Sequence, residues 1–399
     1  MNRKMKIKKP ESFSRKNSKN KLIIGLATAI LLISAVMFAG CLGSDNEIDE
    51  NKKMITITDA FGRTVTLPDD PQKIAVSGSG SMRYFVYMEV SDRAVAVDYQ
   101  DSSSYIVTKD NRPYSIAHPE IRENPMLGTA KGAIDAERLM AAQPDVLFIS
   151  AYGPEDVASA NQIQEKTGIP VVLFYVGNYV TEKETIDSTF RMLGTIFHKE
   201  KRADDLIKYF DGIIIDLQNR IKDVPAPDKT VYMGGVSYNG AHGINGSDPT
   251  YLSFTILKAN NVASPLADSV TQTGYALVSK EKILEWDPDI IIVDLGTMSA
   301  AGGGALVELK TDPSYKELTA VKNGDIYTVN PHTSMNVNHE TSLANCYFVG
   351  KVLYPDQFAD IDPAQKADEI YTFVVGKPVF STLNENVGGI AYTKVDLTK

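Results

Sequence analysis

The chain has 399 residues, with 41 basic and 50 acidic side chains, and 43% of its residues are hydrophobic. A protein that binds nucleic acid needs a basic face, so the acidic balance argues against that class. The two cysteines, Cys41 and Cys346, are too few for a disulfide framework. The length is sufficient for two domains, each with its own hydrophobic core.

The first 40 residues are predicted to be a secretory signal and not part of the fold. Nine basic residues and one acidic residue occur up to Gly40, and an apolar run extends from Leu22 to Phe38. The order Ala39-Gly40-Cys41 resembles the lipobox of exported lipoproteins, in which the signal is removed and Cys41 carries lipid. The rest of the chain is then extracytoplasmic and tied to the outer face of the cytoplasmic membrane. An uncleaved transmembrane anchor is the alternative, because the apolar run is near the lower length limit for a span.

A polar tether is predicted over 41–53. After Gly40 the chain keeps 32 basic and 49 acidic residues, a net charge of −17. Alternating apolar residues over 55–67 predict a β-hairpin that turns at 61–63, and a buried strand follows at 73–77.

A glycine-rich segment, SGSGSMRYFVYME, follows this strand and leads into a helix. Backbone N–H groups at a helix N-terminus favour anions, so Ser79, Ser81 and Arg83 are predicted to meet a carboxylate or phosphate of a ligand. The alternative is a tight turn from strand to helix. The segment lacks the Gly-Lys-Ser/Thr ending of a P-loop and the third glycine of a dinucleotide fingerprint.

Further strands are predicted at 94–99, 145–150 and 171–175. Ligands of open α/β sheets lie outside the carboxyl ends of the strands, so the loops after these strands are predicted to form a cleft. Their tyrosines combine a flat apolar face with one polar atom, which suits a large organic ligand. Packing at the strand ends is the alternative role for each tyrosine, and the polar stretch 101–125 is predicted to be a loop or lid. The tyrosines are Tyr99, Tyr152 and Tyr175.

One long helix is predicted over 199–223, and prolines at 225 and 227 end it. Its apolar residues step by three or four positions and so form one stripe. At 1.5 Å per residue the helix spans roughly 37 Å, enough to connect two domains. The stripe consists of Leu206, Phe210, Ile213, Leu217 and Ile221.

The segments on either side of this helix repeat one another. Residues 134–150 align without gaps with 278–294, always 144 positions apart, and each reads as a short helix, a Pro-Asp turn and a buried strand. The fold class predicted is therefore α/β with two lobes, each a central, mostly parallel sheet flanked by helices. The lobes are placed at 54–198 and 224–399, and the helix 199–223 joins them rigidly.

Beyond the helix, a strand at 230–233 is followed by glycines and then by Tyr238 and His242, which are predicted to face the cleft from the second lobe. Residues 235–239 lack the second glycine of a nucleophile elbow, so no hydrolase is indicated. His332 and His339 follow a strand predicted at 325–329. A single histidine, His242 or His332, could be the axial ligand of a haem or corrinoid. Hydrogen bonding within its own loop is the alternative role for each histidine.

A direct metal site needs three or four converging ligands, and His242, His332 and His339 make that a weaker alternative. Cys346 has no partner once Cys41 carries lipid, and we expect it to be a small buried hydrophobe on a helix.

Five blocks of the sequence resemble, in order and spacing, the substrate-binding proteins of ABC importers for iron-siderophores, haem and cobalamin, the class with a helical connector. The resemblance covers nearly all of the chain after the signal. It implies a receptor that captures an iron complex, haem or corrinoid between two lobes, performs no chemistry on it and has no cofactor of its own. The blocks are TDAFGRTVTLPDDPQKIAV, LGTAKGAIDAERLMAAQPDVLFIS, TGIPVVLF, YKELTAVKNGDIYTVN and KVLYPDQF.

The resemblance also implies a partner, an ABC permease dimer with its ATPase, and a monomeric receptor. In this family an acidic residue on each lobe docks into the two-fold symmetric permease, and Glu137 and Glu281 occupy matching places in the repeat. Stabilisation of each helix by its dipole is the alternative role for these glutamates. Two other functions stay open: a receptor for a bare transition metal, and an exported α/β enzyme acting on a metal chelate. No nucleophile and base pair favours the enzyme.

Overall fold

The computed structural model describes residues 53–129, 133–179, 181–270, 275–299 and 302–397. The predicted signal and Cys41 lie outside the described residues, as does the tether apart from Lys53. No helix in these described ranges is long and apolar enough to cross a membrane. Residue 51 onward forms one compact unit by its internal contacts, so the predicted division into lobes at 199–223 stays a prediction.

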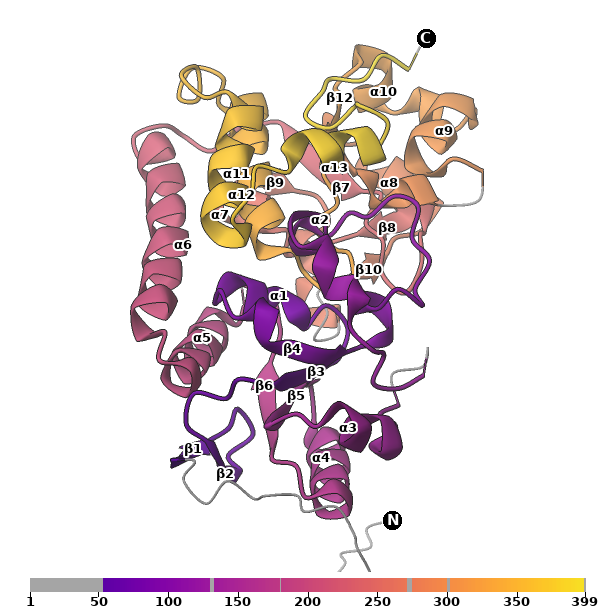
Figure 1. Ribbon diagram of the computed structural model, residues 1–399. Coiled ribbons are helices and arrows are strands. Elements are labelled where there is room, and N and C mark those ends of the chain that lie inside the picture. Colours follow the sequence, from indigo (N-terminus) through magenta and orange to yellow (C-terminus); the bar gives the residue numbers. More distant parts are fainter. Residues whose placement is uncertain (1–52, 130–132, 180, 271–274, 300–301, 398–399) are drawn as a thin grey trace, which may run out of the picture. The chain divides into compact units, whose positions relative to one another are not determined.

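Two parallel sheets of four strands each form the centre of this unit (Figure 1). Both sheets have the same strand order, because the first strand of each set lies between the second and the third. Apart from Asn260–Asn261, the strands consist mainly of apolar residues, as expected where helices cover both faces of a sheet. The predicted fold class is confirmed. The first sheet contains, in chain order, β3 (Ile74–Ser77), β4 (Ala94–Val97), β5 (Val146–Ala151) and β6 (Val171–Tyr175), and the second contains β7 (Thr230–Gly234), β9 (Asn260–Asn261), β11 (Ile290–Asp294) and β12 (Ile326–Val329).

Short antiparallel pairs complete the strands. The predicted hairpin is present as β1 (Met54–Thr58) paired with β2 (Thr64–Pro68), and Gly62 takes the positive φ of +76° that its turn requires. A second pair joins β8 (Gly246–Ser247) to β10 (Ala276–Leu277).

The helices lie mainly on the faces of the two sheets. They are α1 (Met82–Tyr87), α2 (Pro113–Ala117), α3 (Ala136–Ala142), α4 (Pro154–Thr167), α5 (Lys183–Phe197), α6 (Glu200–Ile221), α7 (Leu252–Ile256), α8 (Lys280–Trp286), α9 (Gly304–Thr311), α10 (Thr319–Asn323), α11 (His339–Leu353), α12 (Pro363–Val375) and α13 (Phe380–Asn386). Cys346 is buried in α11, as predicted.

The internal repeat extends to the details of local structure. Helices α3 and α8 begin and end 144 positions apart, and each ends at a residue with positive φ, +48° at Gln143 and +40° at Asp287. The turn that follows each helix ends in an aspartate. Asp145 Oδ2 accepts hydrogen bonds from the backbone N–H groups of Gln72 and Lys73, and Asp289 Oδ2 accepts one from that of Thr230. Each carboxylate therefore fixes the start of the neighbouring strand.

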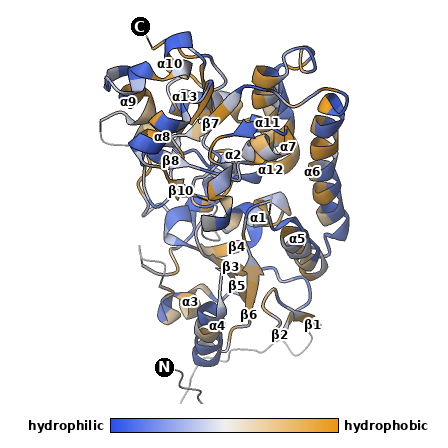
Figure 2. Cartoon of the chain, turned by 180° about the vertical axis from the view of Figure 1, so that it is seen from behind, coloured by the Kyte–Doolittle hydropathy of each residue, from blue (hydrophilic) through white to orange (hydrophobic). Residues whose placement is uncertain are grey.

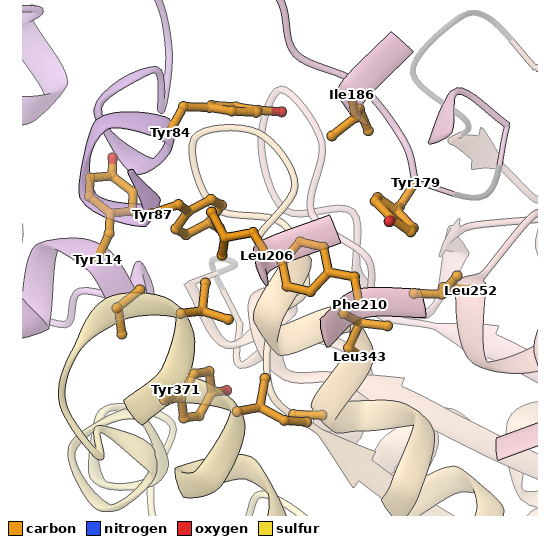
Figure 3. Close-up of a cluster of buried hydrophobic side chains, with 14 of the residues drawn as sticks. Tyr84, Tyr87, Tyr114, Tyr179, Ile186, Leu206, Phe210, Leu252, Leu343 and Tyr371 are labelled. Atoms are coloured by element: carbon orange, nitrogen blue, oxygen red, sulfur yellow. The ribbon is translucent and has the colours of Figure 1, made fainter. Parts of the chain in front are cut away.

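Helix α6 is the predicted long helix, observed over 22 residues. Its predicted apolar stripe is buried, and it packs against α5 and α11. Hydrophobic and hydrophilic residues alternate along it (Figure 2). Leu206 and Phe210 lie among buried side chains that include Tyr87 of α1 and Leu343 of α11 (Figure 3). The helix therefore contributes to a core that reaches from the first sheet's helices to those of the second.

The prediction of a loop or lid over 101–125 is wrong in part, because some of this stretch is helical. The stretch contains α2 and a 3₁₀ helix at Pro119–Glu123. Arg112 is 1% exposed and forms ion pairs of 3.0 Å with Asp101 and 2.7 Å with Asp110, and the Tyr114 hydroxyl donates to Asp101. A buried ionic cluster holds this segment in place, which a search for apolar periodicity does not detect.

The stripe of α6 gives a direct test of this core. Leu217→Ala is expected to lower the free energy of unfolding by about 2–5 kcal/mol, because it removes a fully buried side chain. Ile215→Ala on the same helix is the control; this residue is 56% exposed, and we expect a change below about 0.5 kcal/mol. Urea unfolding of the soluble form beginning at Ser44 measures both changes. Equal losses of unfolding free energy would contradict the assignment of Leu217 to the buried face of α6.

Candidate ligand-binding site

The carboxyl ends of the two sheets meet. The loop after β12, residues 331–338, reaches the turn after β3 and the loop after β5. Ser79 Oγ lies 3.8 Å from Met335 Sδ, and Asn336 Nδ2 donates to the Tyr152 hydroxyl at 2.7 Å. This is the region in which the sequence predicted a ligand cleft.

Arg83 holds this junction together. Its side chain is buried, with 1% of the residue exposed, and it lies on α1 in the first half of the chain. Its Nη1 donates to Val337 O at 2.6 Å, and its Nη2 lies within 3.0 Å of Ser334 O, Met335 O and Asn338 Oδ1. The guanidinium predicted to meet a ligand therefore contacts the chain's own 331–338 loop in this structure.

The backbone of the loop and of the turn are adapted to this contact. Met335 and Asn336 have positive φ values of +50° and +78°, which are unfavourable for residues other than glycine. On the other side, a Cβ atom at Gly80 would lie 1.8 Å from Met335 O, so only glycine permits the close approach. Such strain persists where surrounding contacts hold it, and here Arg83 supplies them.

The remaining predicted residues of the first half lie near the junction in different environments. Tyr152 is 45% exposed. Tyr175 donates its hydroxyl to Glu182, and burial, followed by this hydrogen bond, raises the pKa of Tyr175. Tyr99 packs its ring 5.6 Å from that of Tyr105. Ser81 is fully buried at the start of α1, and its hydroxyl has no hydrogen-bond partner among the described residues.

The second half contributes an aromatic group. Tyr238 is 36% exposed, and its ring lies 4.8 Å from that of Tyr275, a residue that the sequence analysis missed. His242 Nε2 lies 2.6 Å from Tyr238 O, so this ring nitrogen is already engaged. His332 also packs near Tyr275, with ring centroids 6.2 Å apart.

His332 forms a buried charged cluster with two aspartates. Its Nδ1 donates to Asp294 Oδ2 at 2.6 Å, and its Nε2 lies 3.4 Å from Asp248 Oδ2. Burial alone would lower the pKa of His332, but the hydrogen bonds and charges of Asp248 and Asp294 raise it to about 9. Both ring nitrogens therefore face carboxylates, which does not favour the predicted role of His332 as an axial ligand.

His339 and its neighbour Glu340 begin α11 and contact α1. Tyr84 Oη lies 3.0 Å from His339 Nε2, and the Tyr87 hydroxyl donates to Glu340. Burial, followed by the charge of Arg83, lowers the pKa of His339 to about 3, so this imidazole is neutral. Burial also raises the pKa of Glu340. These contacts join the two halves beside Arg83.

No group of three or more His, Cys, Asp or Glu side chains arranged to hold a metal ion occurs within the described part of the chain. His242, His332 and His339 each have a separate hydrogen-bond partner, as given above. The structure therefore provides no support for a shared site for a bare metal ion.

A groove of about 720 Å³ opens in the first half, next to the turn that carries Ser79. It lies between that turn, the end of β5 and helix α4. The residues along it are mostly polar and include Asp98, Gln100, Ser150, Ser159 and Lys166.

Glu137 and Glu281 are both exposed, and each is the second residue of its helix, α3 or α8. Neither side chain belongs to an ion pair among the described residues. The repeat therefore places two equivalent carboxylates on the surface.

Two parallel sheets with meeting carboxyl ends, and a helix that packs against the cores of both, define the architecture of a two-lobed solute receptor. Residues 74–333 match the family described as periplasmic binding protein, and the chain belongs to this family. It is a solute-binding component of an ABC transporter and not an enzyme, so the alternative of an exported enzyme is wrong.

Curated relatives extend over most of the chain. It is 23% identical to the uncharacterized ABC transporter substrate-binding lipoprotein YvrC of Bacillus subtilis, covering 83% of this chain and 98% of that one. It is 26% identical to the molybdate-binding protein MolA of Haemophilus influenzae, covering 79% and 89% of the two chains. The Fe(3+)-citrate-binding protein YfmC of Bacillus subtilis is 23% identical, with coverage of 79% and 91%.

Solved structures agree on the fold. A periplasmic solute binding protein from Veillonella parvula has a TM-score of 0.61 at 21% identity, covering 83% of this chain and 96% of that one. The Haemophilus influenzae MolA structure bound to molybdate has a TM-score of 0.60 at 22% identity, covering 81% and 98%.

The two buried histidines predict opposite dependences of stability on pH. The contribution of His332 is complete below its unfolded pKa of 6.5 and is lost as the pH rises to about 9. The contribution of His339 is complete above 6.5 and is lost as the pH falls toward about 3.

Urea unfolding of the wild type, His332→Gln and His339→Gln at about pH 5, 7 and 9 tests this. The stability difference between wild type and His332→Gln should shrink toward pH 9, and that for His339→Gln should shrink toward pH 5. Differences that do not vary with pH would contradict the assigned protonation states.

Proposed function

We propose that this protein is a lipid-anchored receptor that captures an anionic iron complex, such as a ferric siderophore or haem, between its lobes and delivers it to the permease of an ABC importer. The observation that carries the proposal is the charge of Arg83. The guanidinium is buried at the meeting point of the two sheets, and its hydrogen-bond acceptors are three carbonyl oxygens and an amide oxygen. All four acceptors are neutral.

A buried cation normally has an anionic partner, because removing a charge from water is costly. Arg112 follows this rule and pairs with Asp101 and Asp110. No ion pair involves Arg83 among the described residues. A ligand with carboxylate or other acidic groups, bound beside the 78–81 turn, would supply the missing negative charge. A corrinoid without acidic groups would not, and is the less favoured ligand.

The relatives are consistent with an anionic ligand. Two of them are named for molybdate and for Fe(3+)-citrate. The exposed tyrosines Tyr152 and Tyr238, one from each half, offer aromatic faces and hydroxyl groups to an organic chelator. Molybdate itself, a bare oxyanion, is the second candidate because Arg83 would suit it equally well.

Delivery needs an anchor and a partner. Lipid on Cys41 would hold the receptor at the outer face of the cytoplasmic membrane, and the permease dimer would receive it through Glu137 and Glu281, one from each copy of the repeat. A monomeric receptor with two pseudo-equivalent carboxylates fits a two-fold symmetric partner.

The ligand can be identified by titrating the soluble form with ferric citrate, ferric siderophores, haem, cobalamin, molybdate and free divalent metals. Saturation at 100 times Kd should raise the free energy of unfolding by roughly 2.7 kcal/mol. We expect an anionic iron complex to give this shift, and a response to cobalamin or free metal alone would overturn the proposal.

The role of the Arg83 charge is tested separately by substitution. Arg83→Gln should weaken binding of the responding complex by at least about tenfold, because a charged hydrogen bond or ion pair is lost. Arg83→Lys keeps the charge and should retain more of the affinity. Equal affinities of the two variants would contradict a role for charge, and unfolding curves establish that both variants are folded.

Docking to the permease is tested with charge reversal. Glu137→Arg or Glu281→Arg should abolish uptake in reconstituted vesicles while ligand affinity stays unchanged, because like charges meet at the interface. Glu165→Arg, another exposed glutamate, on α4, is the matched control and should transport normally. Loss of ligand affinity in the purified Glu137 or Glu281 variants would remove the docking role.

A further inference from the structure

The groove in the first lobe contains polar atoms that the protein leaves unpaired. Ser150 Oγ and Gln100 Oε1 are buried and have no hydrogen-bond partner of normal geometry among the described residues, and both side chains line the groove. Burial raises the pKa of Tyr152, and an interaction with the Ser150 side chain opposes that rise. An unpaired buried polar group costs free energy, so two of them in one groove indicate a missing partner.

The glycine at the start of the turn leaves room for one of these atoms, Ser150 Oγ. A Cβ atom at Gly78 would lie 2.0 Å from Ser150 Oγ and 2.8 Å from Ser81 Oγ, so both hydroxyls crowd the same side of the turn. Ser150 is 6% exposed and Ser81 is fully buried. The hydroxyl of Ser150 therefore lies where the groove meets the turn.

The charges along the groove limit what it can hold. Asp98 and Asp156 line it, and both carboxylates already accept backbone hydrogen bonds, from Gly78 N and Tyr152 N respectively. Lys166 is the cation among the described residues that line it. Two carboxylates against one ammonium disfavour an acidic group here, whereas a hydroxyl or amide N–H of a ligand can donate to Gln100 Oε1.

The groove is lined by Ser79 of the turn, and Arg83 approaches the same turn at Gly80. Arg83 Nη2 would be 2.9 Å from a Cβ at Gly80, one residue beyond Ser79. A ligand with its acidic metal-binding part near Arg83 can therefore extend an organic arm into the groove. The volume of about 720 Å³ is within the range of pockets for small organic molecules.

We propose that this first-lobe groove is a specificity subsite for an uncharged arm of the transported chelate, one that carries hydroxyl or amide groups. This inference rests on the proposed function, and it narrows the ligand class from any anionic complex to a chelate with such arms. A bare oxyanion such as molybdate has no arm and would leave the groove empty.

The test measures the affinity of the soluble form of the protein for two ferric complexes by fluorescence titration. One is ferric schizokinen, which joins a citrate centre through amides to two hydroxamate arms that carry no carboxylate, and the other is ferric citrate, which has no such arms. Ser159→Leu adds bulk on the exposed α4 face of the groove, and Ser150→Ala removes the unpaired hydroxyl. Ser188→Leu on α5 is the matched control, because Ser159 and Ser188 are both exposed and both donate to the carbonyl four residues earlier.

We expect the wild type to bind the complex with arms more tightly, and Ser159→Leu and Ser150→Ala to weaken that complex by at least about tenfold. The affinity of each groove variant for ferric citrate should differ from that of the wild type by less than about twofold. Ser188→Leu should bind both complexes with wild-type affinity. The subsite would be overturned if neither groove variant weakened binding, or if the variants lost equal affinity for both complexes. The proposed function would stand in either case. If the wild type binds neither complex nor any other anionic iron complex, the proposed function fails and the subsite with it.

Discussion

The buried Arg83 guanidinium is the contact on which the arrangement of this structure depends. It lies on α1 and binds backbone and side-chain oxygens more than 250 positions later in the chain. This contact places the 331–338 loop against the turn after β3 and stabilises two residues of that loop with unfavourable backbone angles. Among the described residues no ion pair involves this buried charge, although the buried Glu340 is near enough for Arg83 to oppose the rise in its pKa. An anionic ligand, as proposed, would pair with the guanidinium directly.

The two halves share a repeated unit of helix, turn and strand that could be predicted from the sequence. The repeat 144 positions apart predicted equivalent helices, turns and strands, because each copy has the same local features. These are a side chain that caps the helix N-terminus, Asp135 or Ser279, a residue with positive φ, and an aspartate that fixes the next strand. The long helix was equally predictable from its apolar stripe. These features depend on residues close together in the chain, and for this reason periodicity and turn chemistry identify them.

The site was only partly predictable. Residues at the carboxyl ends of strands, such as Ser79, Tyr152 and Tyr238, lie near the junction as the parallel topology requires. The partners of Arg83 could not be predicted, because backbone carbonyl oxygens carry no residue signature. His332 was expected to be open to a ligand, but Asp248 and Asp294 enclose it. These two partners come from distant parts of the chain, one after β8 and one at the end of β11. The groove likewise forms only when distant segments are brought together.

Spin labels on the two lobes would test most directly whether Arg83 holds them together. Labels on cysteines introduced at Glu137 and Glu281 report the distance between equivalent exposed sites in the soluble, ligand-free form, and Cys346 is buried away from the reagent. The account predicts one narrow distance distribution in the wild type and a broader one in Arg83→Ala. A broad or two-peaked distribution in the wild type, or an unchanged one in Arg83→Ala, would contradict it.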